Sequence, residues 1–159
     1  MLTPAQQAAY QADGFLVLPG FKPLDQIAAL RERALQIVEA FDPGSHQAIF
    51  STSDQARRAA GAEFLASGEG IQCFFEEEAF DAQGHLRQAK ALSINKIGHA
   101  MHDLDPVFER FSHGPELAAL AADLGLQRAQ LWQSMYIFKQ PGIGGEVKWH
   151  QDATFLETV

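Results

Sequence analysis

The apolar pattern after Pro23 constrains the fold most, because it predicts one long amphipathic helix. Polar residues such as Arg31, Glu32 and Glu39 stand between its apolar positions. The apolar positions recur at three- and four-residue intervals: Ile27, Leu30, Ala34, Val38 and Phe41.

A capped helix is predicted at the start of the chain. Thr3, Pro4 and Gln6 form a helix start, because the threonine hydroxyl can accept from unpaired backbone amides, proline is tolerated in the first turn and glutamine completes a capping box. This helix should end near Ala12. The apolar run at residues 15–18 then predicts a short strand.

The rest of the chain alternates between predicted strands and short helices. Strands are predicted at residues 71–75, 91–97, 131–138 and 147–155. A turn at residues 81–84 should join the first two in a hairpin-like arrangement, and both faces of the third should be buried. Short helices should begin at Asp105-Pro106 and at Pro115, the second ending at Gly125. Residues 42–70 predict a long connection with a helical turn near residues 55–60.

Length and composition indicate one globular domain, since the chain has 159 residues and is 47% hydrophobic. The net charge of −8 disfavours nucleic acids and anionic membrane surfaces as partners. Cys73 is the single cysteine, so no intrachain disulfide can form and a reducing compartment fits. Because the first residues lack a basic, apolar leader and no apolar run approaches about 20 residues, we expect a soluble cytoplasmic protein.

The residues most indicative of chemistry are His150 and Asp152, in a predicted strand after a glycine-rich loop. Residues two apart on an extended backbone point to the same side, so one imidazole nitrogen and one carboxylate oxygen can meet one ion. Two such ligands and a distant histidine form the facial triad of non-heme iron oxygenases, which leaves coordination positions open. Zinc and manganese remain alternatives, and such a pair also occurs in ordinary surface loops.

Other polar residues fit structural roles. We expect the acidic run Glu76-Glu77-Glu78 to be a solvated turn or strand end, and Trp149 to pack opposite His150. The sequence has no phosphate-binding glycine loop with a lysine, no nucleophile elbow and no paired zinc histidines on a helix. Five further histidines could each supply a third ligand, but we expect each to be structural or at the surface: His46, His85, His99, His102 and His113.

Four ordered segments resemble the phytanoyl-CoA dioxygenase family, and the likeness runs along nearly all of the chain. They are QADGFLVL at 11–18, SINKIGHA at 93–100, QSMYIFKQP at 133–141, and GGEV at 144–147 followed by HQDA at 150–153. The resemblance implies an α+β fold, namely a double-stranded β-helix of jelly-roll or cupin type with flanking N-terminal helices. It also implies an Fe(II)- and 2-oxoglutarate-dependent dioxygenase that acts on a small molecule.

The resemblance further implies roles for individual residues. His150 and Asp152 would be the catalytic iron ligands, whereas Lys96, Met135 and Gln151 would lie at or near the 2-oxoglutarate site. These roles suit the residue types, since an ammonium can offset a cosubstrate carboxylate and a thioether offers adaptable apolar contact. Without the family, Lys96 would be read as a solvated strand-end lysine and Met135 as ordinary core.

In this family the third iron ligand and a cosubstrate-binding arginine follow well after the His-x-Asp pair, and the sequence ends at Val159. We therefore expect residues 1–159 to be the N-terminal part of a single domain, with sheet edges exposed in isolation. The alternative is a catalytically incompetent fragment or pseudoenzyme that acts as a binding module. The expected partner is a small-molecule substrate, with no nucleic acid and no membrane, and the oligomeric state is left open.

Overall fold

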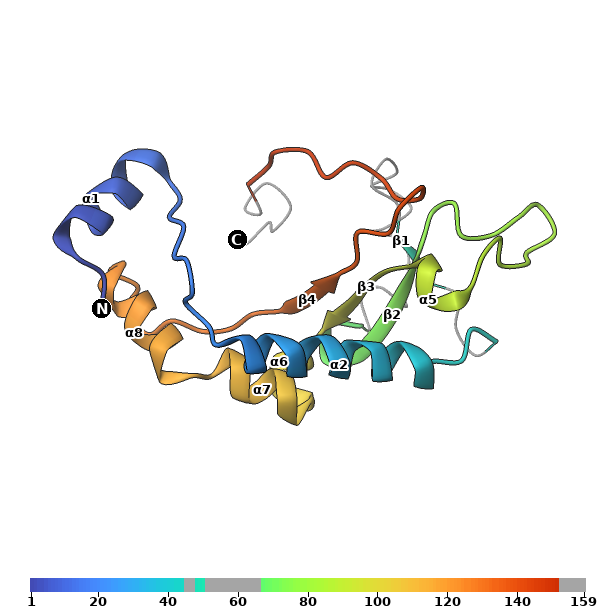
Figure 1. The fold of residues 1–159 in the computed structure, drawn as a ribbon, viewed down its shortest axis with the longest axis horizontal. Coiled ribbons are helices and arrows are strands. Elements are labelled where there is room, and N and C mark those ends of the chain that lie inside the picture. Colours follow the sequence, from blue (N-terminus) through green and yellow to red (C-terminus); the bar gives the residue numbers. More distant parts are fainter. Residues whose placement is uncertain (45–47, 51–66, 152–159) are drawn as a thin grey trace.

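The fold is known from a computed structural model that describes residues 1–44, 48–50 and 67–151. It is a mixed α+β fold in which four strands form one sheet, with α2 (Leu24–Ala40), α6 (Met101–Leu104) and α7 (Pro106–Ser112) along one side of it (Figure 1). The strand order is β1-β2-β3-β4. The strands are β1 (Ile49–Phe50), β2 (Ile71–Glu76), β3 (Ile94–His99) and β4 (Ser134–Ile137).

The two central strands, β2 and β3, pair antiparallel, which confirms the predicted hairpin-like arrangement. Strand β4 continues the antiparallel pattern beside β3, and β1 runs parallel to β2. The ladder between β2 and β3 contains a bulge, because Phe74 pairs with Lys96 but Phe75 pairs with Ile94. Asn95 is therefore the extra residue on β3, and such a residue redirects nearby side chains.

The first two helices form where the sequence predicts them. Helix α1 (Pro4–Asp13) begins with the predicted capping box between Thr3 and Gln6, and it ends at Gly14, whose φ of 77° is the left-handed conformation that glycine tolerates. Helix α2 (Leu24–Ala40) follows Pro23. In α2, the central residues of the predicted stripe are buried, but Ile27 is 37% exposed. The first turns of α2 pack beside α7 instead of over the sheet, which explains that exposure (Figure 1).

The remaining helical elements are short and lie between the strands. Asp105 begins α7 by accepting hydrogen bonds from two backbone amides, as the Asp-Pro pair predicts. Helix α8 ends before Gly125, which has a φ of 82°. The elements are the 3-10 turn η1 (Ser67–Glu69), α5 (Lys90–Ser93), α6 (Met101–Leu104), α7 (Pro106–Ser112) and α8 (Pro115–Asp123).

The hydrophobic core lies between α2 and one face of the sheet. We call this the core face, and Cys73, Ile97 and Tyr136 mark it because they pair across β2, β3 and β4. Phe75 is fully buried there, and its ring lies 4.9 Å from that of Phe80. A buried aromatic side chain of this kind contributes roughly 1.5–3 kcal/mol through apolar burial. Apolar packing in this core therefore holds α2 against the sheet.

Three predicted strand segments differ from the structure. Residues 15–18 form no strand, and Phe15 and Val17 are 65% and 71% exposed. Residues 91–93 belong to α5, where a turn closes between Leu92 and Ala89. The described part of the segment 147–155 is not strand, and its residues 147–151 are exposed. Apolar runs favour strands, but a strand forms only where a neighbouring strand can pair with its backbone N–H and C=O groups.

The predicted strand at 131–138 narrows to the four residues of β4, and only one of its faces is packed. Tyr136 and Phe138 pack on the core, whereas Met135 and Ile137 are 44% and 46% exposed. The expectation that both faces would be buried was therefore wrong. The proposed helical turn near residues 55–60 lies outside the described residues.

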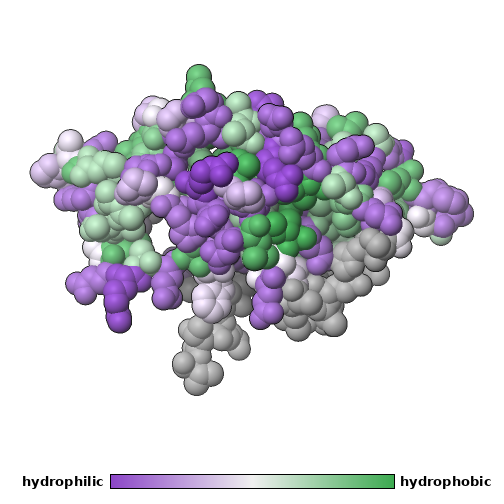
Figure 2. Space-filling view, turned by 90° about the horizontal axis from the view of Figure 1, so that it is seen from below, coloured by the Kyte–Doolittle hydropathy of each residue, from purple (hydrophilic) through white to green (hydrophobic). Residues whose placement is uncertain are grey.

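The outer surface of the helical layer is largely hydrophilic, with apolar side chains gathered in separate patches (Figure 2). Among the described residues, no helix combines the length and the apolar character that crossing a bilayer requires.

Candidate functional site

The face of the sheet opposite the core carries the polar residues of interest. Phe74, Lys96 and Ile137 pair across β2, β3 and β4, so they share this side, which we call the Lys96 face. Gly98 and Met135 pair one step further along and lie on the same side. Side-chain alternation thus separates the candidate site from the core within the same three strands.

Lys96 is the central residue of this face. Its side chain is buried, with only 4% of the residue exposed, and its Nζ lies 3.7 Å from the Sδ of Met135. The ammonium also lies over the ring of Phe50, 3.4 Å from its centroid, and 5.5 Å from the centroid of Phe74. Lys96 is therefore not the solvated strand-end lysine that its residue type alone suggested. The structure brings together two of the three residues predicted for the cosubstrate site.

The aromatic rings explain how a cation can stay buried at this position. Removing an ammonium from water is costly, and the negative face of an aromatic ring returns part of that cost, about 2 kcal/mol when the pair is desolvated. The thioether of Met135 adds a polarisable contact. A buried cation held in this way attracts an anion, so the Lys96 face is electrostatically suited to a carboxylate.

His99 lies beside this lysine and is also buried. Its Nδ1 is 2.9 Å from the Ser67 hydroxyl, and its ring centroid is 5.4 Å from that of Phe74. Burial, reinforced by the positive charge of Lys96, lowers the pKa of His99 to about 4. His99 is thus a neutral imidazole at pH 7, and the sequence expectation of a structural histidine fits its bond to Ser67.

Glu76 forms a second buried polar group at the end of β2. It is 3% exposed, and its Oε2 accepts a hydrogen bond of 2.9 Å from Nδ2 of Asn95, the bulge residue. Gly144, in the glycine-rich loop, lies near the same carboxylate, because a Cβ added at this position would be 3.0 Å from Oε1 of Glu76. The expectation of a solvated acidic run holds for Glu77 and Glu78, which are exposed, and fails for Glu76.

His150 follows the glycine-rich loop and is exposed. Its Nδ1 is 2.7 Å from the carbonyl oxygen of Lys148, so the ring donates from Nδ1 and carries the imidazole lone pair on Nε2. That tautomer suits metal ligation through Nε2, because a second contact on the other nitrogen orients the ring. Trp149 is fully exposed, so its predicted packing opposite His150 was wrong.

Gln151 is exposed next to His150, and Asp152 lies outside the described residues, so the predicted pairing of His150 with Asp152 stays a prediction. Within residues 1–44, 48–50 and 67–151, no group of three or more histidine, cysteine, aspartate or glutamate residues is placed to hold a metal ion.

The other histidines contact neighbouring polar groups. His102 is buried, and the Ser134 hydroxyl lies 3.0 Å from its Nδ1, while His113 Nε2 lies 3.3 Å from the exposed carboxylate of Asp103. His85 is exposed beside Asp81. These contacts agree with the expected structural or surface roles, whereas His46 lies outside the described residues.

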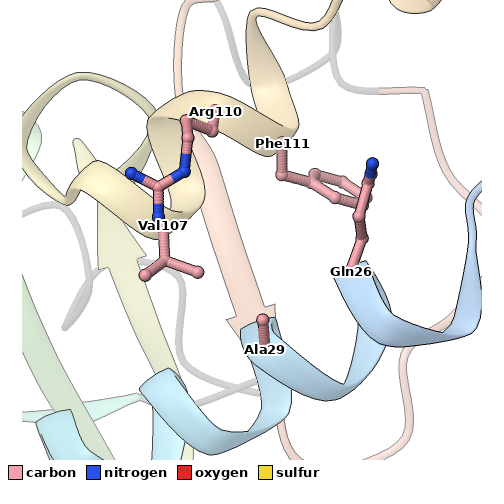
Figure 3. Close-up of a pocket in the computed structure, with 5 residues that line it drawn as sticks. All are labelled: Gln26, Ala29, Val107, Arg110 and Phe111. Carbon is pink, nitrogen blue, oxygen red and sulfur yellow. The ribbon is translucent and has the colours of Figure 1, made fainter.

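A solvent-open pocket of about 170 Å³ lies in the helical layer, on the other side of the sheet from Lys96. Residues of α2 and α7 line it, and Figure 3 shows them around the gap between these helices: Gln26, Ala29, Val107, Arg110 and Phe111. It includes no residue of the predicted site. Cys73 is buried in the core, and this burial raises the pKa of its thiol to about 11, which disfavours the reactive thiolate.

The family resemblance singled out Lys96 and Met135, which the structure brings together, but it did not indicate the residues around them. Phe74 and Asn95 were read only as parts of strands, and Glu76 as part of a solvated acidic run. One signal in the sequence could have indicated these neighbours. Strict alternation in residues 71–76 places Phe74 and Glu76 on the same side, away from Cys73 and Phe75.

Comparison with known proteins places this geometry in a family. The family model described as phytanoyl-CoA dioxygenase matches residues 10–159. A rice protein named phytanoyl-CoA dioxygenase 1 is 49% identical over 157 residues, and phytanoyl-CoA dioxygenase domain-containing protein 1 from cattle is 48% identical over 161 residues. Each alignment covers 99% of this chain and 55% of the relative. The chain belongs to the phytanoyl-CoA dioxygenase family, and it spans about half the length of these curated relatives.

Proposed function

We propose that this chain contributes to an Fe(II)- and 2-oxoglutarate-dependent dioxygenase that oxidises a C–H bond of a small-molecule substrate. The single observation that carries the proposal is the buried ammonium of Lys96 beside Met135 on the sheet face away from the core. Family membership supports the reaction class, since curated relatives carry the name phytanoyl-CoA dioxygenase. That name describes what those relatives act on, and we propose no particular acyl chain here.

We propose that the fold is the opening part of one double-stranded β-helix domain with flanking N-terminal helices. The four-stranded sheet, covered by helices on its core face, supports this arrangement. The alignments point the same way, because they cover 99% of this chain but 55% of each relative. The Lys96 face would then be the inner face of the completed β-helix.

The residues of the Lys96 face fit 2-oxoglutarate by their chemistry. The ammonium of Lys96 would bind a carboxylate of the cosubstrate, and the thioether of Met135 would pack along its short carbon chain. The ring of Phe74, which is almost fully buried, would help to exclude water, so the charge pair would act at low dielectric. Gln151 would contact the cosubstrate from the segment that holds the metal ligands.

The residues after the glycine-rich loop fit a metal by their donor types. His150 would ligate through Nε2, the nitrogen opposite its contact with Lys148 O, and Asp152 would add a carboxylate oxygen. Bound Fe(II) would supply the reactivity toward dioxygen, and the protein would supply binding and orientation. Both ligands belong to one short segment, so the backbone between them would set their spacing.

Succinate formation from 2-oxoglutarate tests the proposal in a polypeptide that contains this chain. Asp152→Ala should abolish turnover, because the carboxylate ligand of the facial triad is lost. Lys96→Met should raise the 2-oxoglutarate concentration needed for half-saturation by about tenfold to a hundredfold, as expected when a charged hydrogen bond is removed. Lys139→Met removes the same charge from an exposed loop position and should leave both quantities unchanged.

Two results would remove the proposed function. One is succinate production in Asp152→Ala at the wild-type rate. The other is an equal effect of Lys96→Met and Lys139→Met on half-saturation, because the buried ammonium would then have no special part in cosubstrate binding.

A further inference from the structure

The contact between Glu76 and the glycine-rich loop joins the sheet to the segment that bears His150. Glu76 ends β2 and is almost fully buried. A buried carboxylate is costly unless hydrogen bonds satisfy it. Among the described residues, its one hydrogen-bond partner is Asn95, whose Nδ2 donates to Oε2 over 2.9 Å. The other oxygen, Oε1, is the one that lies nearest to Gly144.

Asn95 reaches this carboxylate because of the bulge in the sheet. Phe74 pairs with Lys96 and Phe75 pairs with Ile94, which leaves Asn95 as the unpaired extra residue. A bulge re-aims the side chain of its extra residue. The same irregularity that leaves Lys96 in register with Phe74 therefore also turns Asn95 toward Glu76, so the two polar groups of this face depend on one feature of β3.

A side chain at position 144 would be crowded by Glu76. A Cβ at position 144 would lie 3.0 Å from Oε1 and 3.4 Å from the carboxyl carbon of Glu76. Gly144 also has a φ of 114°, a conformation that side chains disfavour. The loop backbone at Gly144 thus lies close to the Glu76 carboxylate, with little room for a side chain between them. Only six positions separate this contact from His150 in the chain.

We propose that Glu76 is a positioning residue that seats the glycine-rich loop on the sheet and so sets where His150 stands relative to Lys96. This inference rests on the proposed function, because it assigns those residues to the metal and to the cosubstrate. Glu76 touches neither. It acts through the loop, as outer partners of metal ligands do when they orient a site.

The first test measures Mn(II) affinity by titration, following the electron paramagnetic resonance signal of the free ion, in the polypeptide that contains this chain. Glu76→Ala and Gly144→Ala should each weaken Mn(II) binding by about tenfold to a hundredfold, the usual cost of losing an outer partner of a metal site. Glu76→Gln keeps the size and an acceptor oxygen, so it should restore affinity to within about threefold of wild type. Glu78→Gln removes the same charge from an exposed neighbour and should have no effect.

A double mutant asks whether Glu76 and Gly144 act together. An alanine at 144 would place its Cβ 3.0 Å from Oε1 of Glu76, and this tight contact is absent when position 76 is also alanine. The loss of Mn(II) affinity in Glu76→Ala/Gly144→Ala should therefore be at least about threefold smaller than the product of the two single losses. Strictly multiplicative losses would overturn the proposed contact.

Backbone nitrogen-15 relaxation of the metal-free protein separates this inference from the proposed function. Glu76→Ala should lower the order parameters of the Gly144 and Gly145 amides to about 0.6 or below, and leave the order parameter of the β3 amide of Ile97 near about 0.85. Unchanged order parameters in the loop would overturn the inference, even if Mn(II) binds. Absence of Mn(II) binding to wild type would remove the metal site of the proposed function, and the order parameters alone would then decide the inference.

Discussion

The two faces of the sheet are made by the same strands and yet differ completely in chemistry. On the core face, Cys73, Phe75 and Ile97 pack under α2 as an apolar layer. The residues that alternate with them along the strands point to the Lys96 face. Two of these are charged and buried, since Lys96 and Glu76 are each less than 5% exposed. Burial alone therefore does not distinguish a core from a site. What distinguishes them is whether the buried groups are apolar and close-packed, or polar and held by specific partners.

The two faces also contribute differently to the stability of the fold. Apolar packing on the core face supplies folding free energy in proportion to buried area. Buried charges contribute little net stability, because desolvation opposes their interactions. We therefore expect substitutions on the core face to act mainly on unfolding, and substitutions on the Lys96 face to act mainly on ligand binding.

Among these substitutions, Phe75→Ala on the core face should lower the free energy of unfolding most. Phe75 is fully buried, and its ring packs against those of Phe41 and Phe80. Truncation to alanine therefore leaves a cavity beneath α2. The free energy of unfolding should fall by about 3–5 kcal/mol. Urea denaturation followed by circular dichroism measures it, and a loss below about 1 kcal/mol would contradict the packing.

Asp105→Ala should have the next largest effect, because this buried carboxylate caps α7 and also accepts from Nε of Arg33 over 2.6 Å. We expect a loss of about 1–3 kcal/mol, since the cap and a partly exposed ion pair are removed together.

The pH dependence of that pair has a defined sign. Burial raises the pKa of Asp105, but the hydrogen bond from Arg33 and those from the α7 amides outweigh it, so the net pKa is lowered. The stabilisation is present above the unfolded carboxyl pKa, about 3.9, and is lost as pH falls through the lower folded value. A wild-type excess in stability over Asp105→Ala that persists undiminished at pH 2 would contradict this assignment.

Protonation of His99 should lower the free energy of unfolding in a higher pH range than protonation of Asp105 does. Burial and Lys96 lower the folded pKa of His99 to about 4, below the ordinary value near 6.5. The unfolded chain therefore binds the proton first, and stability that is complete above pH 6.5 is lost toward pH 4, at up to about 1.4 kcal/mol per pH unit. Comparing unfolding at pH 7 and pH 5 checks this. His99→Gln should flatten the difference, and an equal pH slope in the variant would refute the assignment.

Lys96→Met should change stability least, and so sharpens the contrast between the faces. Methionine keeps much of the length and apolar stem of lysine while it removes the buried charge, so the free energy of unfolding should change by less than about 1 kcal/mol or rise slightly. Ile97→Ala, the neighbouring residue on the core face, should cost about 2–5 kcal/mol. Equal losses in the two variants, measured by urea unfolding, would show that the faces do not differ in the way described.

Local sequence signals were sufficient for the elements whose stability is local. The capping box at Thr3 and Gln6, the helix α2 and the cap at Asp105 depend on neighbours within a few residues, and all three formed as predicted. The segment at 15–18 lacked such local support. Its apolar composition suits a strand, but strand formation depends on a distant partner that the sequence does not reveal.

By itself, the sequence determined the main helices, the central hairpin-like pair and the resemblance that singled out Lys96, Met135 and the His-x-Asp segment. Only the tertiary structure decided that Lys96 is buried between aromatic rings and that Glu76 meets both Asn95 and Gly144. The physical reason is that burial and cross-strand contact are set by register. One extra residue in β3 changed which side chains face one another, and no local pattern announces such a shift.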